Sequence, residues 1–159
     1  MSLKIRHFNC FQTTIFLYNS ALWTIAPSQA NSIDAFHRRQ LRYGMGICYP
    51  KIINNEDLYR IIKEIPWSQT IKERRHRFLG HLCRLPENTP ARQSLRETLR
   101  PYTKKCGRPK LTWIEQVRNE LKDNGLTPDQ NFENIINEAS NRKKWRKRIT
   151  DNGGQPSED

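Results

Sequence analysis

Apolar residues recur along this chain at steps of three and four residues, in segments that Pro, Gly and Asn separate. This spacing puts side chains on one face of an α-helix, whereas a half-buried strand alternates apolar and polar residues. No alternating stretch of useful length is present. The sequence therefore predicts an all-α fold, a small irregular bundle of about six or seven helices.

Capping residues place the ends of these helices. Asn54 with Asp57, and Thr112 with Glu115, are typical helix starts, and the segment 44–46 with its two glycines is a typical helix end. We expect helices over residues 3–18, 27–44, 54–65, 68–85, 89–99, 112–124 and 127–149, the last with a break near Ser140 and Asn141.

The chain is expected to divide into a first helical segment (1–26), a helical core region (27–99), a basic linker (100–111), a C-terminal helical region (112–150) and a tail (151–159). The tail has no large apolar side chain to bury, so we expect it to be disordered. The N-terminal stretch is too polar for a signal-peptide core or a membrane span. Four scattered cysteines without a Cys-x-x-Cys pair favour a reducing compartment, so we expect an intracellular protein of the nucleus or cytoplasm.

Positive charge dominates the composition and is unevenly distributed. The chain has 28 Lys and Arg against 16 Asp and Glu, a net charge of +12. Residues 71–110 hold twelve basic and three acidic side chains, residues 142–149 hold six basic and no acidic ones, and residues 111–141 hold two basic and six acidic ones. Such segregation predicts a basic patch, and its commonest use is phosphate neutralisation with counterion release. A solvated helix face followed by a basic tail is the alternative interpretation.

Two basic stretches are the predicted nucleic-acid contacts. One is the helix 68–85 together with the basic linker 100–111, and the other is the run near the C-terminus. Arg75 lies inside the apolar arc of its helix, where an arginine needs an anionic partner such as a bound phosphate to offset its desolvation. The predicted nucleic-acid-binding residues are Arg74, Arg75, Arg77, Arg84, Lys104, Lys105, Arg108, Lys110, Arg142, Lys143, Lys144, Arg146, Lys147 and Arg148.

Two features within these stretches each allow two interpretations. The Gly-Arg-Pro-Lys segment 107–110 resembles a minor-groove hook, and a plain basic turn has the same composition. Trp145 can stack on a base or, together with Ile149 one turn later, belong to the core.

Motifs for catalysis are absent from the sequence. It has no Gly-rich phosphate loop, no Gly-x-Ser-x-Gly elbow and no pair of aspartates in an apolar strand. Phosphoryl transfer with two metal ions requires clustered carboxylates. We therefore expect no catalytic residue, no metal site and no cofactor.

Seven segments occur in an order and spacing that characterise one protein family. They are Leu17–Trp23, Ala35–Arg42, Asn55–Leu58, Arg74–His81, Arg84–Pro86, Gly107–Trp113 and Asn141–Arg146. Together they resemble the C-terminal part of LINE-type (non-LTR) retrotransposon reverse transcriptases, over about residues 2–149. The most specific part is the Arg-rich helix ending in Leu-Gly-His, followed by Gly-Arg-Pro-Lys and Lys-Trp-Arg.

The resemblance implies a polymerase thumb remnant, beginning with residues 1–26, and the segment after it. In that family the metal-binding Asp-Asp motif of the palm and the endonuclease domain lie upstream, so the implied fragment holds RNA and DNA without a reaction of its own. The palm, or another element-encoded protein, is the implied protein partner, and a palm carboxylate is a second candidate partner for Arg75. The chain departs from the family at Asn19, Ala21 and Phe78, where Gly, Glu and Trp are usual, so the contact made by the family's acid at position 21 is absent.

Two other functions remain open from the sequence. The chain can be an inert remnant whose helices need the palm to fold, or an interaction protein that binds an acidic partner through its basic face. A cooperative thermal transition distinguishes a folded domain from a remnant. Competition by heparin against an acidic peptide distinguishes a nucleic-acid ligand from an acidic protein.

Overall fold

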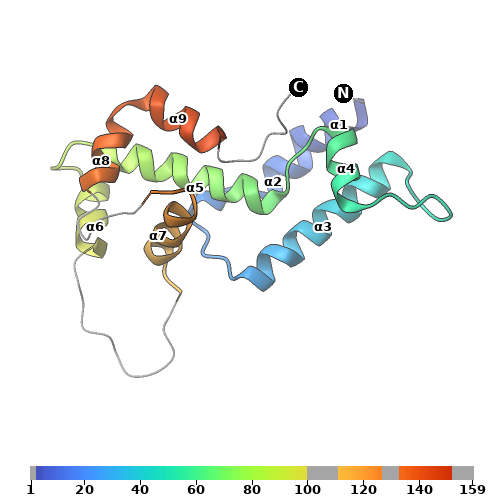
Figure 1. The fold of residues 1–159 in the computed structure, drawn as a ribbon, viewed down its shortest axis with the longest axis horizontal. Helices are drawn as coiled ribbons and strands as arrows, with labels where there is room; N and C mark the ends of the chain where they lie inside the picture. The colour runs from blue at the N-terminus through green and yellow to red at the C-terminus, as the bar shows by residue number, and fades with distance from the viewer. Residues whose placement is uncertain (1–2, 100–110, 127–132, 152–159) are drawn as a thin grey trace, which may run out of the picture. The chain divides into compact units, whose positions relative to one another are not determined.

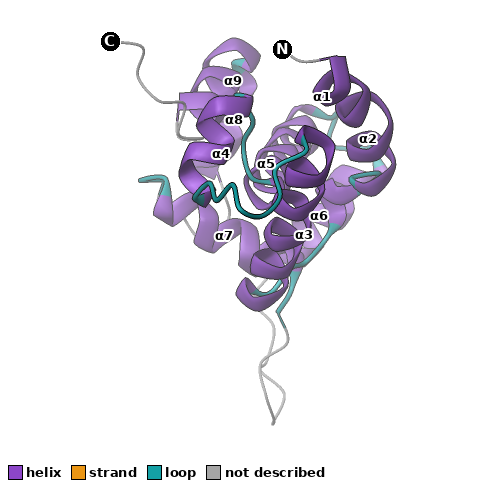
Figure 2. Ribbon diagram, turned by 90° about the vertical axis from the view of Figure 1, so that its right-hand side faces the viewer, coloured by secondary structure: helices purple, strands orange, loops and turns teal. Residues whose placement is uncertain are grey.

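A computed structural model describes residues 3–99, 111–126 and 133–151 (Figure 1). Within these ranges the chain forms helices joined by loops, and no strand is present (Figure 2). The predicted all-α class is therefore confirmed. The elements are α1 (Leu3–Phe8), the π-helix η1 (Asn9–Thr13), α2 (Thr14–Phe16), the 3₁₀-helix η2 (Ser20–Leu22), α3 (Pro27–Met45), α4 (Asn55–Ile62), α5 (Trp67–Arg84), α6 (Pro90–Leu99), α7 (Trp113–Asp123), α8 (Glu133–Ser140) and α9 (Arg142–Asp151).

The predicted caps form as expected. The Asn54 side chain accepts a hydrogen bond from the Asp57 amide at 2.8 Å, and the Thr112 hydroxyl accepts one from the Glu115 amide at 3.3 Å. Gly46 ends α3 in the left-handed conformation, with φ of 66°, which glycine adopts without a steric penalty. The break between α8 and α9 is also confirmed, whereas the expected start of that helical region, at 127–132, lies outside the described residues.

The described residues belong to two compact units, Met1–Ile71 and Lys72–Asp159, each with a hydrophobic core of its own. The boundary lies inside α5, and therefore within the expected core region 27–99. The first core is built from the N-terminal helical run, α3, α4 and the first turn of α5. The second is built from the rest of α5 with α6, α7, α8 and α9.

The N-terminal helical run buries a different face from the one that its sequence predicts. The spacing of Ile5, Phe8, Phe11, Ile15 and Tyr18 predicts one apolar side of a regular α-helix, yet Phe11, Ile15 and Tyr18 are exposed, and Leu17 is completely buried instead. The π-helix explains the difference, because it adds a residue to one turn and rotates everything after it by about 100°. With that rotation, Leu17 comes to the side of Ile5 and Phe8, while Ile15 and Tyr18 turn outward.

Aromatic rings in the first unit gather around Trp67, at the start of α5. The His37 ring stacks on the Trp67 ring with centroids 4.4 Å apart, and Phe16 stacks on Trp67 at 4.6 Å. Asp34, one turn before His37, accepts hydrogen bonds from the Ser68 amide at 2.9 Å and from its hydroxyl at 2.5 Å. The first turn of α5 is thus held against α3 by both ring stacking and a carboxylate.

His37 is fully buried in this cluster, and its environment favours the neutral imidazole. Burial, and second the charge of Arg38, lower the pKa of His37 from 6.5 to about 4. Its Nδ1 lies 3.4 Å from the Tyr59 hydroxyl oxygen, while its Nε2 has no hydrogen-bond partner within the described residues. Protonation of the ring is therefore much less favourable in the folded protein than in the unfolded chain.

Acid should therefore weaken the first unit. Above pH 6.5 the imidazole is neutral in both states, and between pH 6.5 and 4 only the unfolded chain gains the proton. The free energy of unfolding should fall over that window by up to about 3 kcal/mol and be constant with respect to this group below it. Urea unfolding at several pH values should show this loss in the natural chain and not in the His37→Phe variant. Equal slopes in the two proteins would contradict it.

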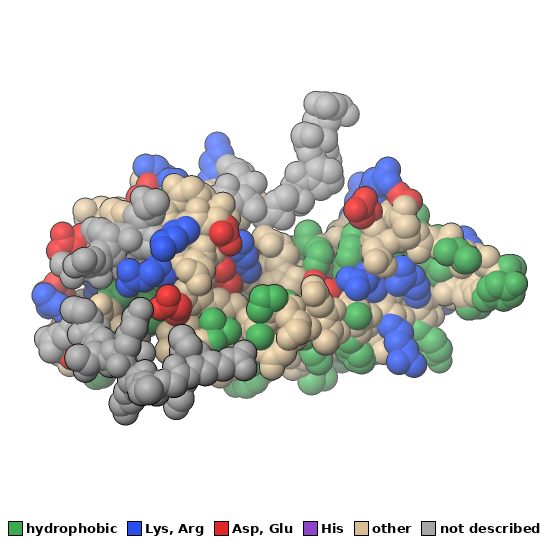
Figure 3. Space-filling model, turned by 60° about the horizontal axis from the view of Figure 1, so that its bottom comes forward, with side chains coloured by type: hydrophobic (Ala, Val, Ile, Leu, Met, Phe, Trp, Pro, Cys, Tyr) green, Lys and Arg blue, Asp and Glu red, His purple; other side chains and the backbone are tan. Residues whose placement is uncertain are grey.

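Large apolar side chains remain on the surface of the first unit. They are Leu3, Phe11, Ile15, Phe16, Tyr18, Leu22, Phe36, Tyr43, Tyr49, Ile52 and Ile61, against Leu111 in the described part of the second. Several green side chains at the right-hand end of Figure 3, around the loop between α3 and α4, belong to this group. The sequence predicts Leu58, Ile61 and Ile62 as the apolar side chains of the helix 54–65, but only Leu58 and Ile62 are buried, and Ile61, about 60° from Leu58 and about 100° from Ile62 around the axis, is exposed.

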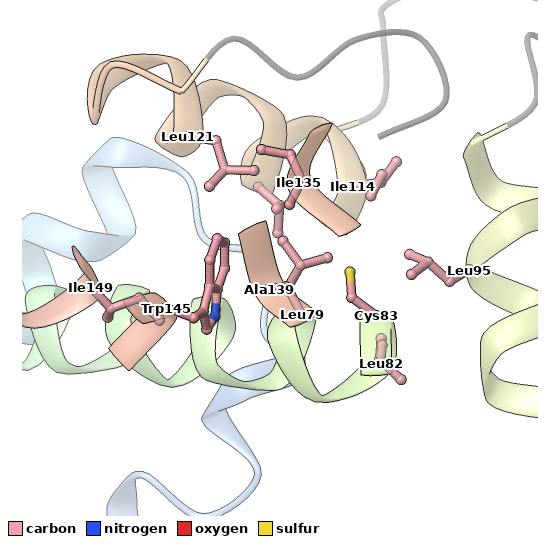
Figure 4. Packing of buried hydrophobic residues seen from close by; sticks show 11 residues of the cluster. Leu79, Leu82, Cys83, Leu95, Ile114, Leu121, Ile135, Ala139, Trp145 and Ile149 are labelled. Atoms are coloured by element: carbon pink, nitrogen blue, oxygen red, sulfur yellow. The ribbon is translucent and has the colours of Figure 1, made fainter. Parts of the chain in front are cut away.

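In the described residues of the second unit, α5, α6, α7, α8 and α9 contribute side chains to one core (Figure 4). Leu79, Val117, Ile135 and Ala139 are completely buried there, one or two from each of α5, α7 and α8. Trp145 and Ile149 add α9 to the same core. None of the described helices combines the length and the apolar character that crossing a bilayer requires.

Candidate nucleic-acid interface

The helix α9 carries the second predicted basic stretch, and a local cap starts it. The Asn141 side chain accepts hydrogen bonds from the amides of Lys143 and Lys144, both at 3.1 Å. This arrangement satisfies two of the free amides at the helix start. Asn141 therefore separates α8 from α9 and caps the first turn of the helix that carries the basic run.

Trp145 fixes α9 to α5. The indole is 3% exposed, and its Nε1–H donates to the backbone oxygen of His76 at 3.1 Å. A Cβ added to Gly80 would lie 2.2 Å from the indole Nε1, so the ring occupies the space that a side chain at position 80 would fill. The core interpretation of Trp145 holds for the described structure, since a ring with so little exposure cannot stack on a base as it stands.

The first two turns of α9 carry several exposed cations outside its buried side. At 100° per residue, Arg142, Lys143, Arg146 and Lys147 occupy an arc of about 140° that begins about 20° from Ile149, at Arg142, and ends about 160° from both Trp145 and Ile149, at Lys147. These four side chains and Lys144 are exposed, and none has an ion-pair partner within the described residues. Arg142, Lys143, Lys144, Arg146 and Lys147 are called the basic face below.

The basic face is unfavourable for the isolated helix in two ways. Like charges stand at i, i+4 in the pairs Arg142–Arg146 and Lys143–Lys147, and each such pair costs a few tenths of a kcal/mol. Three cations also occupy the first turn without an acid, where the helix dipole favours anions. A segment that breaks local rules while remaining packed is commonly a binding surface.

Arg148 does not belong to the basic face. Its guanidinium donates two hydrogen bonds to the Glu138 carboxylate of α8, at 2.8 and 2.9 Å. This bidentate pair fixes α9 to α8, in addition to the contact of Trp145 with α5. Among the residues predicted in this run, Arg148 is therefore the one with a structural partner in the described chain.

Arg75 has found its anionic partner inside the protein. It is 1% exposed and pairs with the carboxylate of Glu120 on α7, where His76 Nε2 also lies 3.2 Å from Glu120 Oε2. Burial alone would raise the pKa of Glu120, but the nearby His76 imidazole and the charge of Arg75 outweigh it and hold that pKa below its usual range. The expectation that a phosphate or a palm carboxylate neutralises Arg75 is corrected, because α7 supplies the carboxylate.

The other predicted residues of α5 are more accessible. Arg77 is exposed and pairs with Glu73 one turn earlier, at 3.1 Å. Arg74 is half-buried, and burial, then the charge of Arg77, lower its pKa. Arg84 donates to the backbone oxygen of Ala139 at 2.8 Å and so satisfies a carbonyl near the C-terminal end of α8.

The structure thus brings only part of the predicted set together. Residues of α5 and α9 belong to one unit and meet through Trp145, whereas the predicted loop residues Lys104, Lys105, Arg108 and Lys110 lie outside the described residues. Sequence reasoning missed the partner of Arg75, although a Glu on the buried side of α7, four residues before Asn124, was available as a signal.

Comparison with known proteins does not identify a family for this chain. No family model matches the chain, and neither the curated proteins nor the solved structures contain a match.

Proposed function

We propose that this chain binds nucleic acid through the phosphate backbone, using the basic face of α9. The observation that carries the proposal is a helix anchored by a buried tryptophan whose exposed side holds five cations without partners in the described residues. Side chains held by a folded unit lose less freedom when they bind a polyanion than those of a flexible tail. Binding of this kind is weakly sequence-specific and strongly dependent on salt.

The resemblance to LINE-type reverse transcriptases supports the same proposal from the sequence. We propose that the chain is a retrotransposon-derived fragment corresponding to the thumb and the following segment, which holds RNA or DNA without a reaction of its own. Several partly buried carboxylates in the described residues already engage a side chain of this chain, as Glu120 does with Arg75 and Asp34 with Ser68. Such carboxylates are poorly placed to hold the two metal ions of phosphoryl transfer.

Neutralising the basic face tests the proposal. Lys143, Lys144, Arg146 and Lys147 are changed together to Gln, and affinity for labelled single-stranded RNA and duplex DNA is measured by fluorescence anisotropy at several salt concentrations. Affinity should fall for all sequences alike. The logarithmic salt slope on duplex DNA should become shallower by about 0.9 for each phosphate that the variant no longer neutralises, and by about 3.6 if each of the four side chains neutralises one phosphate in the natural chain.

The matched control removes the same charge from the first unit. Lys4, Arg6, Arg39 and Lys51 are exposed, and their joint change to Gln also lowers the net charge by four. This control should retain most of the affinity and slope. Equal weakening in both variants would assign binding to net charge alone, and unchanged binding after neutralising the basic face would refute the proposal. Displacement by an acidic peptide as effective as displacement by heparin would favour an acidic protein partner instead.

A further inference from the structure

Thr150 lies on the same side of α9 as the basic face, about one turn beyond its last cations. At 100° per residue it falls between Arg146 and Lys143 around the axis of α9, one turn after Arg146 and Lys147. Its side chain is exposed, and its hydroxyl donates to the Arg146 backbone oxygen at 3.1 Å. A group attached to Thr150 Oγ1 would therefore project among the cations that are proposed to hold phosphate.

The residues before Thr150 distinguish it from other exposed hydroxyls. Three consecutive cations, Arg146, Lys147 and Arg148, occupy the positions four, three and two residues ahead of it. No other exposed Ser or Thr of the described residues follows three cations in this way. Protein kinases with acidic substrate clefts select hydroxyls by cations at these positions, since the clefts bind them as ion pairs.

We propose that Thr150 is a phosphorylation site of a kinase that selects basic substrates, and that its phosphate switches the basic face off. The switch rests on the proposed function, whereas the modification itself does not. ATP is the phosphoryl donor: Thr150 Oγ1 forms a bond to the γ-phosphorus, the bond from that phosphorus to the β–γ bridging oxygen breaks, and ADP leaves. The hydroxyl proton passes to the catalytic base of the kinase.

A phosphate at this position competes for the same cations that nucleic acid needs. It carries a charge of about −1.5 to −2 at neutral pH and lies within helical reach of Arg146 (i−4) and Lys147 (i−3). Phosphate–guanidinium pairs are strong charge-assisted contacts. The C-terminal end of a helix is also unfavourable for negative charge, so the phosphate should weaken the helical structure of the last turn. The modified face should neutralise about two fewer phosphates of the nucleic acid, because Arg146 and Lys147 are engaged within the helix.

The position of Thr150 also gives a kinase access. Only Asp151 follows it in α9, so a kinase that binds residues 146–150 in an extended conformation needs to open the C-terminal half of α9 and not the whole helix. That opening takes Ile149 out of the core and breaks the Arg148–Glu138 pair. Helix ends open at a small fraction of the global unfolding free energy, so slow but complete labelling of the folded chain is expected.

The test uses the full chain and the catalytic subunit of cyclic-AMP-dependent kinase with ATP. Mass spectrometry should locate a phosphate on Thr150, and the Thr150→Val variant should show none there. The phosphorylated chain should bind RNA and duplex DNA about tenfold more weakly or worse, with the slope on duplex DNA shallower by about 1.8. The Thr150→Val variant should bind as tightly as the natural chain, which shows that the hydroxyl itself is dispensable.

The two proposals fail in different ways. If the unmodified chain does not bind nucleic acid, both the proposed function and the switch are refuted. Mass spectrometry still shows whether Thr150 is phosphorylated. Labelling at Thr112 or elsewhere in place of Thr150 would overturn the modification site. A phosphate on Thr150 that leaves both affinity and salt slope unchanged would overturn the switch.

Discussion

The Glu120→Ala variant should lose about 3–5 kcal/mol of unfolding free energy, measured by urea unfolding with circular dichroism. Glu120 pairs with Arg75, whose side chain is 2% exposed, and its other carboxylate oxygen lies 3.2 Å from His76. Removing the carboxylate leaves a guanidinium charge in the core of the second unit, and uncompensated buried charges cost this much in other proteins. The loss concerns the second unit, to which α5 beyond Ile71 and α7 both belong.

Two further variants show whether charge is the cause. Glu115→Ala removes an exposed acid from the first turn of the same helix, and should cost no more than about 1 kcal/mol. The double change Arg75→Met and Glu120→Leu replaces the ion pair by apolar side chains, and should recover most of the loss. A loss below about 1 kcal/mol in Glu120→Ala would mean that Arg75 finds water or another anion, and would contradict the buried pair.

Substituting Gly80 by alanine should cost about 3 kcal/mol. The new methyl group would lie 2.2 Å from Nε1 and 2.6 Å from Cδ1 of Trp145, well inside van der Waals contact. The indole is held by its hydrogen bond to the His76 carbonyl, so relieving the clash breaks that bond and lifts α9 from α5. Overpacking alone costs about 1–3 kcal/mol, and exposure of part of a buried tryptophan adds to it.

Gly44 provides the matched control, because it also lies in a helix but has no atom within 4 Å of an added Cβ. Gly44→Ala should stabilise the protein by about 0.5–1 kcal/mol through helix propensity. Hydrogen exchange in α9 should accelerate in Gly80→Ala and stay unchanged in Gly44→Ala. Combining Gly80→Ala with Trp145→Leu should cost less than the sum of the two single changes. A neutral or stabilising Gly80→Ala would contradict the close packing.

The helix ends could be predicted from nearby residues, whereas contacts between residues distant in sequence could not. Asn54, Thr112 and Gly46 act through backbone groups a few residues away, so their roles follow from the adjacent sequence. The partner of Arg75 comes from a helix 45 residues later, and no local pattern connects the two positions. The apolar arc revealed that Arg75 needed an anion without revealing which one.

The N-terminal run shows a second limit, which concerns helix phase. Ile5, Phe8, Ile15 and Tyr18 fit a regular α-helix, and that periodicity correctly predicted a helix. The π-helix between them changes which residues face inward, because Leu17 and the ring stacking of Phe16 on Trp67 favour the shifted phase. The choice between phases depends on Trp67, which is distant in sequence, so periodicity alone could not predict it. The exposure of the cations of the basic face could be expected from the local sequence of α9, whereas their binding to nucleic acid stays a prediction.

The cations of the basic face make dissolved ions act on α9 in two opposite directions. In the free chain, counterions shield Arg142, Lys143, Arg146 and Lys147 from one another, so added salt relieves repulsion within the helix and strengthens its packing. In a complex with a polyanion the same ions compete for the cations and weaken the attachment. In dilute buffer, the packing of α9 is therefore weakest in the free chain, and a polyanion that bound the basic face would stabilise the unit that carries it.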